Sequence, residues 1–535
     1  MRKKIYRVSK ALQILVLVFI VAALASIAGC AGKKAVPKAE PAKPKYVPWT
    51  INAPRAEKPL PPLPLDESAQ AQALRDQLTN LILEAQLGDP NIGVVVEALT
   101  DQRALFALNE HLPLTPASNT KLYTTAAALE GLSAEFRYQT RLAVRGERNG
   151  PLVNGDLVVL GSGDPTISGG LGEEGIMGDM KQWIGEIKAK GIAMVSGHLV
   201  GDESLFDQYT LCPGCTWDDE SKTFAAHSGA LSCNQNCISV VLEPGERDGD
   251  QAEVCLLPDT GYVAVANESQ TSGKKKPKPY LTVERVHESN VIEVKGQFPR
   301  RAQKKVVGVT VEDPAGYFVT VLAEAMEAAG ITIQGGRKVF SGQPELYRSQ
   351  DLETLFTHSS PPLGVILAET NKESNNFYAE QLLKTLGAGV HGKGTRETGV
   401  DVITQWLLSM GVPDSEIDLY DGSGLSRYNR VSPRATATLL RYMAAQPDFE
   451  TYFRSLAIAG VDGTLKRRMR GTPAEGNVHA KSGFLKRISA LSGYVVGADA
   501  KLYSFVVMVD DTSSTGKAKE LQDAICILLS RYSSN

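Results

Sequence analysis

The hexapeptide Pro116-Ala117-Ser118-Asn119-Thr120-Lys121 precedes an apolar stretch over residues 122–130. In a helix that begins near Ser118, Lys121 lies on the same face as the serine, because residues three apart are neighbours on a helix. A lysine amine beside a hydroxyl can activate a serine nucleophile without a histidine. Serine is also a common helix N-cap, and taken alone the hexapeptide favours this second interpretation.

A second polar motif, Asn371-Lys372-Glu373-Ser374-Asn375-Asn376, interrupts a helically spaced apolar pattern over residues 363–383. The interruption predicts a loop between two helices. Ser374 offers a hydroxyl that can relay a proton, and Asn376 offers an amide that can bind a substrate amide. The alternative is an ordinary N-cap, with Ser374 or Asn375 starting the second helix.

A third motif, Lys481-Ser482-Gly483-Phe484, lies in a predicted strand over residues 478–485. A lysine and a hydroxyl at a strand edge can hold a carboxylate, and a glycine lets a ligand backbone approach closely. The alternative is a solvated lysine beside a bulge glycine.

Similar tripeptides and tetrapeptides occur elsewhere, since Ser-x-x-Lys recurs at 272–275 and 514–517 and Ser-x-Asn recurs at 232–234. The two Ser-x-x-Lys copies lie in a lysine-rich loop and a glycine turn, with no apolar helix to hold the serine beside the lysine. Lys481-Ser482-Gly483 is the only Lys-Ser/Thr-Gly in the chain. Order and context therefore select Ser118 with Lys121, then Ser374 with Asn376, then Lys481 to Gly483, and the nucleophile interpretation of Ser118 overtakes the cap.

Periodicity predicts the elements around these motifs. Before the Ser118 helix we expect a helix over 74–85 and strands at 92–99 and 104–108. After the third motif we expect strands at 488–496 and 502–509 and a helix over 518–529. Between about 138 and 350 the chain carries short strands such as 157–160, 238–242 and 262–266, a helix over 317–329 and a lysine-rich solvated loop over 271–278.

The beginning of the chain is typical of an exported protein. Arg2, Lys3 and Lys4 precede an apolar stretch over 11–28, which fits an export signal, with an uncleaved membrane anchor as the competing interpretation. Ile27-Ala28-Gly29-Cys30 resembles the bacterial lipobox and favours lipidation at Cys30. Residues 31–65 are rich in proline and lysine, which predicts a semi-rigid spacer between a lipid-anchored Cys30 and the folded chain.

Composition excludes some classes of function. A net charge of −3 argues against a nucleic-acid-binding protein, which is usually basic. The seven histidines show no metal-ligand spacing and no Gly-x-Ser-x-Gly motif is present, so we expect no metal and no cofactor. In an exported protein, the cluster of Cys212, Cys215, Cys233 and Cys237 favours disulfides, with structural zinc second; Cys255 can join them, and Cys526 reads as a buried thiol.

The ordered set of motifs resembles the penicillin-recognising serine enzymes, and most closely the class C low-molecular-mass D-alanyl-D-alanine carboxypeptidase/endopeptidases. Further segments also resemble this family: Gly163-Asp164-Pro165-Thr166, Asn371 to Glu380, Asp421 to Arg427, and Gly460 to Leu465. The resemblance implies an α+β multidomain fold: a split β-lactamase/transpeptidase-like domain, with an antiparallel sheet flanked by helices, and inserted strand-rich modules. The expected division is 1–30 signal peptide, 31–65 linker, 66–138 with 350–535 catalytic domain, and 139–349 insertion, with a second module nested at about 226–304.

The resemblance also implies roles for residues. Ser118 attacks the carbonyl of the penultimate D-alanine, Lys121 is the base if burial and Lys481 lower its pKa, and Ser374 relays a proton to the leaving amine. For substrate binding, Asn376 contacts the substrate amide, Lys481 and Ser482 orient the terminal carboxylate, the N–H groups of Ser118 and Phe484 form the oxyanion hole, and Arg427 is a further contact. Peptidoglycan stem peptides and β-lactams are the expected partners.

Two positions depart from the family pattern. Asn375 stands where aspartate is common, and Lys-Ser-Gly-Phe replaces the usual Lys-Thr-Gly-Thr, so that a bulky Phe484 is expected to narrow the groove. A β-lactamase and a poorly active penicillin-binding cell-wall protein remain as alternatives. The sequence leaves open the balance between carboxypeptidase and endopeptidase, the stem peptide chemistry, the membrane that holds Cys30 and the oligomeric state.

Overall fold

The computed structural model describes residues 47–49, 51–168, 175–208, 212–343, 345–348 and 352–535. The expected export signal and Cys30 lie outside these residues. Within the described ranges, no helix has both the length and the apolar character needed to span a membrane.

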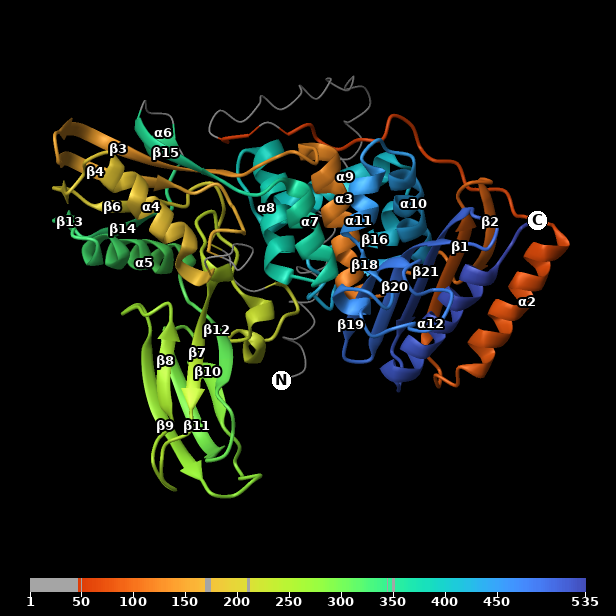
Figure 1. Cartoon of the computed structure of the whole chain (residues 1–535). Helices are drawn as coiled ribbons and strands as arrows, with labels where there is room; N and C mark the ends of the chain where they lie inside the picture. Colours follow the sequence, from red (N-terminus) through yellow and green to blue (C-terminus); the bar gives the residue numbers. More distant parts are fainter. Residues whose placement is uncertain (1–46, 50, 169–174, 209–211, 344, 349–351) are drawn as a thin grey trace, which may run out of the picture. The chain divides into compact units, whose positions relative to one another are not determined.

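A six-stranded sheet combines strands from both ends of the chain, in the order β18-β19-β20-β21-β1-β2, with every neighbouring pair antiparallel (Figure 1). The predicted strands of both halves are present in it. Their bounds are β1 Asn91–Ala98, β2 Arg103–Leu108, β18 Ala457–Ile458, β19 His479–Leu485, β20 Ile488–Val496 and β21 Leu502–Asp510.

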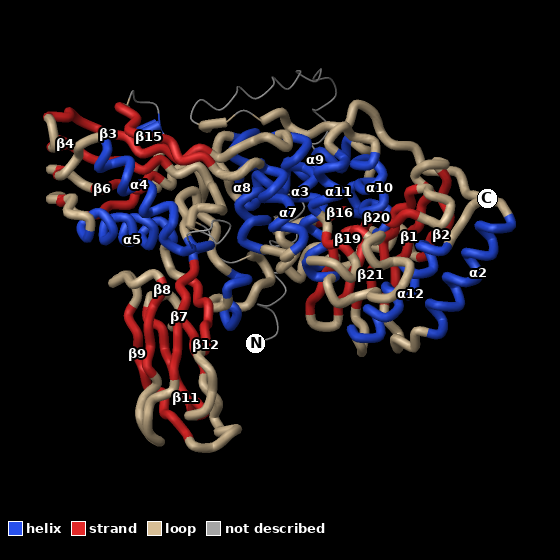
Figure 2. The backbone as a smooth tube through the Cα atoms, viewed as in Figure 1, coloured by secondary structure: helices blue, strands red, loops and turns tan. Residues whose placement is uncertain are grey.

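Both faces of this sheet are buried because successive apolar side chains point to opposite faces. Val94 and Val96 of β1 pack with helices α2 (Ala69–Glu84) and α12 (Thr515–Arg531), whereas Val95 packs into the core on the other face. The helices that share that second core are α3 Thr120–Leu132, α7 Leu363–Lys372, α8 Asn376–His391, α9 Arg396–Ser409, α10 Pro433–Ala444 and α11 Phe449–Ser455 (Figure 2). The expected antiparallel sheet flanked by helices is confirmed.

The stretch between α3 and α7 builds three further sheets with a core of its own. A seven-stranded sheet comprises β3 Gln139–Asn149, β4 Leu152–Leu160, β5 Met194–Val195, β6 Leu199–Asp202, β13 Thr332–Ile333, β14 Arg337–Phe340 and β15 Glu353–Ser359. Two three-stranded sheets comprise β7 Cys237–Glu243, β8 Glu253–Leu257 and β12 Lys305–Thr310, and β9 Ala264–Ser272, β10 Thr282–Arg285 and β11 Val291–Pro299. The helices here are α4 Gly178–Ala189, α5 Pro314–Ala328 and α6 Glu345–Arg348, and β16 Ile417–Asp418 pairs with β17 Arg430–Val431 farther along the chain.

Residues 51–65 differ from the expected spacer, because they pack along the folded chain. Ile51 and Ala56 are buried in the helical core, and the N–H of Leu60 donates to the Met410 carbonyl at 2.8 Å. The prolines keep this segment extended, and its regularly placed apolar side chains give it a surface to bury. A cavity of about 390 Å³ lies beside the segment, and none of its lining residues belongs to the three motifs.

Among the cysteines that the structure describes, Cys212 and Cys215 form one disulfide. Cys233 and Cys237 are free thiols, so the expectation of disulfides holds for one pair of the cluster and is wrong for the other. Because two of the four sulfurs bond to each other, a four-cysteine zinc site is not formed. Cys526 is a buried free thiol, as expected, and Cys255 is exposed and free.

A candidate serine acyl-transfer site

Ser118 lies in the single 3₁₀ turn Ala117–Asn119, and α3 begins two residues later at Thr120. The serine does not cap either helix, since Pro116 and Asn119 occupy the cap positions without side-chain hydrogen bonds. The cap interpretation of Ser118 is therefore wrong. Its hydroxyl instead accepts a hydrogen bond from the Lys121 Nζ at 3.2 Å, as the spacing of three residues predicted.

The Lys121 amine is completely buried and has three oxygen partners. It donates to the Ser118 Oγ, to the Asn376 Oδ1 at 2.6 Å and to the Ser423 carbonyl at 2.6 Å. Burial lowers the pKa of Lys121 to about 7, against the opposing effect of nearby carboxylates. An amine with such a pKa is available in its neutral, basic form near neutral pH.

Lys481 approaches the same site from strand β19. Its Nζ donates to the Ser374 Oγ at 2.8 Å and to the Ser482 carbonyl at 2.9 Å. Burial lowers the pKa of Lys481 well below its usual value, and the charge of Lys121 lowers it further. Of the two causes expected to lower the pKa of Lys121, burial is the main one, and Lys481 is not among the charges that shift it.

The second motif forms a tighter connection than expected, because α7 extends to Lys372 and α8 begins at Asn376. Ser374 takes a left-handed backbone conformation there, with φ of +59°. Asn375 is the N-cap of α8 and accepts from the Tyr378 N–H at 3.2 Å, so the cap alternative is confirmed for this residue.

The amide of Asn375 explains one departure from the family pattern. Its Nδ2 donates to the Gln235 Oε1 at 2.9 Å and to the Glu369 Oε1 at 3.3 Å. An aspartate could cap the helix equally well, but it has no hydrogen to donate and would face the Glu369 carboxylate.

Asn376 uses both ends of its carboxamide within the protein. The oxygen accepts from Lys121, and the Nδ2 donates to the carbonyl of Phe224 at 2.8 Å. A residue of the long insertion thereby orients the side chain that contacts the lysine.

The alternation along β19 separates the third motif into two sides. A Cβ on Gly483 would lie 2.6 Å from the Pro116 carbonyl, so this position faces the turn that carries Ser118. The ring of Phe484 points the other way, with the Lys519 Nζ of α12 at 4.8 Å from its centroid. The expectation that the ring narrows the groove is therefore wrong, because its neighbours belong to the opposite layer.

Two other predicted binding residues lie at the edge of β19. The Ser482 hydroxyl donates to the Thr464 Oγ1 at 2.7 Å, which pairs two exposed hydroxyls beside Lys481. Arg427 is exposed, and its Nη1 donates to the Lys486 carbonyl at 3.4 Å, just beyond the end of the strand.

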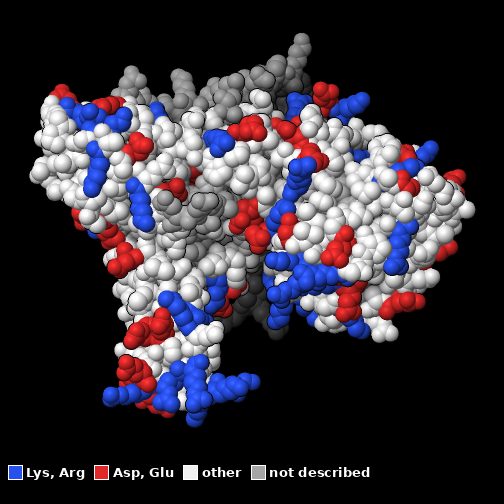
Figure 3. All heavy atoms as spheres, viewed as in Figure 1, with Lys and Arg blue, Asp and Glu red and all other residues white. Residues whose placement is uncertain are grey.

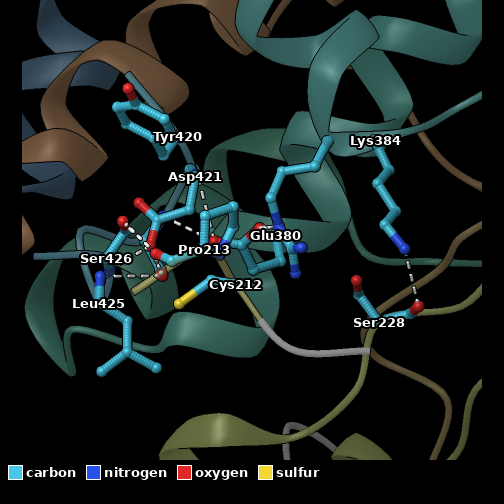
Figure 4. Close-up of polar contacts among 12 residues, drawn as sticks. Cys212, Pro213, Ser228, Glu380, Lys384, Tyr420, Asp421, Leu425 and Ser426 are labelled. Carbon is cyan, nitrogen blue, oxygen red and sulfur yellow. Dashed lines mark hydrogen bonds and ion pairs between the residues drawn. The ribbon is translucent and has the colours of Figure 1, made fainter. Parts of the chain in front are cut away.

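The loop from Asp421 to Ser426 is a component that the motifs alone did not reveal. The Asp421 carboxylate accepts from the N–H groups of Gly424 at 2.8 Å and Ser426 at 2.6 Å, and the Ser426 hydroxyl donates to the Pro213 carbonyl within the disulfide loop (Figure 4). The loop from Asp421 to Ser426 contributes the backbone carbonyl of Ser423 to the site. Any residue type can supply a backbone carbonyl, so no sequence pattern marks this acceptor. Only the family resemblance of residues 421–427 indicated this stretch.

A group of side chains with metal-ligand chemistry lies in the insertion. Glu220, His227 and Glu312 offer ligand atoms within 4.8 Å of one another. The guanidinium of Arg285 already pairs with both carboxylates, at 3.1 Å from Glu220 and 2.7 Å from Glu312. We therefore assign the group as a buried charge cluster. The sequence did not reveal it, because its members are far apart in the chain.

On the face shown in Figure 3, acidic and basic side chains are interspersed. The candidate catalytic residues are two buried lysines, Lys121 and Lys481, with two serines and an asparagine that are half-buried. A split α+β domain with this constellation defines a penicillin-recognising serine enzyme.

Comparison with known proteins specifies the family. Residues 74–532 match the model of the D-Ala-D-Ala carboxypeptidase 3 (S13) family, and the chain belongs to this family. It is 34% identical over 498 residues to a D-alanyl-D-alanine carboxypeptidase of Actinomadura sp., covering 88% of this chain and 89% of that protein. It is 26% identical to D-alanyl-D-alanine carboxypeptidase DacB of Haemophilus influenzae, covering 79% of this chain and 86% of that one. The fold is similar to the crystal structure of penicillin binding protein 4 from H. influenzae, with a TM-score of 0.74 at 24% identity over 85% of this chain and 99% of that chain.

Proposed function

We propose that the protein is a serine D,D-peptidase of peptidoglycan, which cleaves D-Ala-D-Ala termini or D-Ala cross-links through an acyl-enzyme on Ser118. The observation that carries this proposal is the contact between the Ser118 hydroxyl and the buried Lys121 amine, within a family of D-Ala-D-Ala carboxypeptidases. The neutral amine accepts the serine proton as the oxygen attacks the carbonyl of the penultimate D-alanine.

The remaining residues complete the cycle. Ser374, in contact with Lys481, passes a proton to the departing D-alanine amine. The N–H groups of Ser118 and Phe484 stabilise the oxyanion, for which the outward ring of Phe484 is no obstacle. Water then hydrolyses the acyl-enzyme.

Substrate contacts follow from the groups that line the edge of β19. Lys481 and Ser482 orient the terminal carboxylate, with Thr464 beside them, and Arg427 is a further contact. Asn376 binds the substrate amide by exchanging its bond to Phe224. A β-lactam enters by the same route, because its strained amide presents a carbonyl and a carboxylate in a similar arrangement.

We also propose that residues 66–138 and 360–535 form the catalytic domain and that the insertion extends to Ser359, because β15 pairs with β3. The protein is further proposed to be a lipoprotein of the cell envelope, tethered through Cys30 after export. The mass of the mature N-terminal peptide tests this: a peptide that begins at a lipidated Cys30 supports it, and a peptide that retains residues 11–28 contradicts it.

Products of intact peptidoglycan decide between the two D,D-peptidase activities. Mass spectrometry separates free D-alanine from uncrosslinked muropeptides, and release of neither would contradict the proposed activity. Incubation with penicillin, followed by peptide mapping, should place the acyl group on Ser118.

A further inference from the structure

Glu380 is a buried carboxylate on the helix that carries the Ser-x-Asn motif. It lies four residues after Asn376 on α8, so the two side chains project from the same helical face. The glutamate is 8% exposed, and most of the helix around it is buried. A buried charge destabilises the fold unless it is hydrogen-bonded.

Its main partners are backbone N–H groups of the loop that follows Asp421. The Glu380 Oε1 accepts from Gly422 at 3.0 Å and from Ser423 at 2.9 Å. The carbonyl of that same Ser423 accepts from the Lys121 Nζ at 2.6 Å. One residue therefore joins the glutamate to the catalytic lysine, with its N–H on the carboxylate and its C=O on the amine.

Two glycines allow the loop to pass close enough to make both bonds. A Cβ on Gly422 would lie 2.9 Å from the Ala379 carbonyl of α8. A Cβ on Gly424, which has φ of +82°, would lie 1.9 Å from the Ala117 carbonyl beside the nucleophile. The loop is thus pressed between α8 and the Ser118 turn, and Figure 4 shows Glu380 beside Asp421 in this layer.

We propose that Glu380 is a positioning residue for Lys121: it fixes the Ser423 carbonyl against the amine, and its negative charge, together with that of Asp421, favours the protonated amine. This inference rests on the proposed role of Lys121 as the base for Ser118.

Other charges face Lys121 from each element around it. Asp421 lies on the loop, Glu380 on α8 and Lys481 on β19. The Asp421 and Glu380 carboxylates raise the pKa of Lys121 against the larger effect of burial. Arg396 of α9 lies 3.5 Å from the Glu380 Oε2 and partly balances its charge. Replacing Glu380 by a neutral group of the same shape should consequently make Lys121 less basic.

The test is the rate of acylation by a fluorescent penicillin as a function of pH. In the full-length Glu380→Gln variant, the amide oxygen keeps the two N–H bonds while the charge is lost. The rising limb of the profile should then move to lower pH, as expected for loss of an opposite charge. In Glu380→Ala the carbonyl is also released, and acylation should fall about tenfold or more at every pH.

Glu130→Gln is the matched control, because Glu130 lies on α3 with Lys121 but bonds to Tyr442 instead. Its profile should coincide with that of the parent protein. A Glu380→Gln profile with an unmoved limb would overturn the inference, whether or not the rate falls. Loss of acylation in Ser118→Ala tests the proposed function separately, so the two failures are distinguishable.

Discussion

The Nζ of Lys481 lies 2.8 Å from the Oγ of Ser374, although 107 residues separate them in sequence. The contact joins strand β19 of the sheet to the connection between helices α7 and α8. Lys121 makes the equivalent contact with Ser118. Each serine of the site is therefore paired with its own buried lysine.

Acylation should depend on the neutral form of Lys121. Since burial lowers the pKa of Lys121 to about 7, the acylation rate should rise as the pH increases through that value. Lys121→Met keeps an unbranched side chain that ends at Cε and removes the base, and should slow acylation by about 10²–10⁴-fold. Penicillin acylation from pH 5 to 9 measures both, with exposed Lys188→Met as the control. A Lys121→Met rate within tenfold of the parent would exclude the amine as the base.

The Ser374 hydroxyl should be required for proton transfer and not for folding. Ser374→Ala removes it, and Ser374→Gly removes it while suiting the φ of +59°. Both variants should slow acylation by roughly 10²-fold or more. Restoration of the rate in the glycine variant would show that backbone strain, rather than the missing hydroxyl, explains the alanine result.

Asn375, which follows Ser374, should affect the stability of the fold and not the acylation rate. It caps α8 and bonds to Gln235 and Glu369. Asn375→Ala should lower the free energy of unfolding by about 1 kcal/mol, the usual effect of losing a cap. Urea denaturation measures this loss, while acylation stays within a few-fold of the parent. An unchanged urea midpoint would refute the capping role.

These residues show what the sequence could predict. The pairing of Ser118 with Lys121 follows from a spacing of three residues at the start of a helix, which is a local property. Five of the six strands of the six-stranded sheet were predicted from alternating or continuous apolar runs, whereas the two-residue strand β18 was not. The contact between Lys481 and Ser374 is not local, and it required the order of the motifs and the family resemblance.

Two contacts of the site could not be predicted from the sequence, because they are made by backbone carbonyls, which every residue type has. The carbonyls of Ser423 and Phe224 contact Lys121 and Asn376 through the backbone. Residues 51–65 belong to the stretch predicted as a semi-rigid spacer from its proline content. A few apolar side chains, such as Ile51 and Ala56, are enough to dock this segment on the folded chain. The size of Phe484 led to the prediction of a narrower groove, whereas its position on β19 turns the ring toward α12.

Phe484→Thr, which introduces the common residue of the family, should change acylation by less than about threefold, since surface substitutions usually have small effects. The 55% exposed ring contacts Lys519 and leaves the side of Gly483 clear. The measurement is the second-order rate constant with penicillin. A gain of tenfold or more in the threonine variant would mean that the ring obstructs the cleft.

His227 should make the protein sensitive to mild acid. Burial, aided by the charge of Arg285, lowers the pKa of His227 from 6.5 to about 4. Between these values the unfolded chain binds the proton and the folded chain does not, so stability is lost as the pH falls. From pH 7 to 5 this amounts to about 2 kcal/mol.

His227→Leu removes the titrating group and keeps an apolar side chain in the same place. Urea denaturation of both proteins at pH 7 and 5 should show a smaller acid loss in the variant. Equal losses in the two proteins would exclude His227 as the cause.

The central claim is that Ser118 is the nucleophile of a D,D-peptidase. Release of D-alanine from a stem pentapeptide that ends in D-Ala-D-Ala, measured for the parent protein and for Ser118→Ala, tests it most directly. The parent protein should release D-alanine, and the variant should lose several orders of magnitude in rate, as nucleophile variants do. Release of D-alanine by Ser118→Ala at a rate comparable to the parent would contradict the claim.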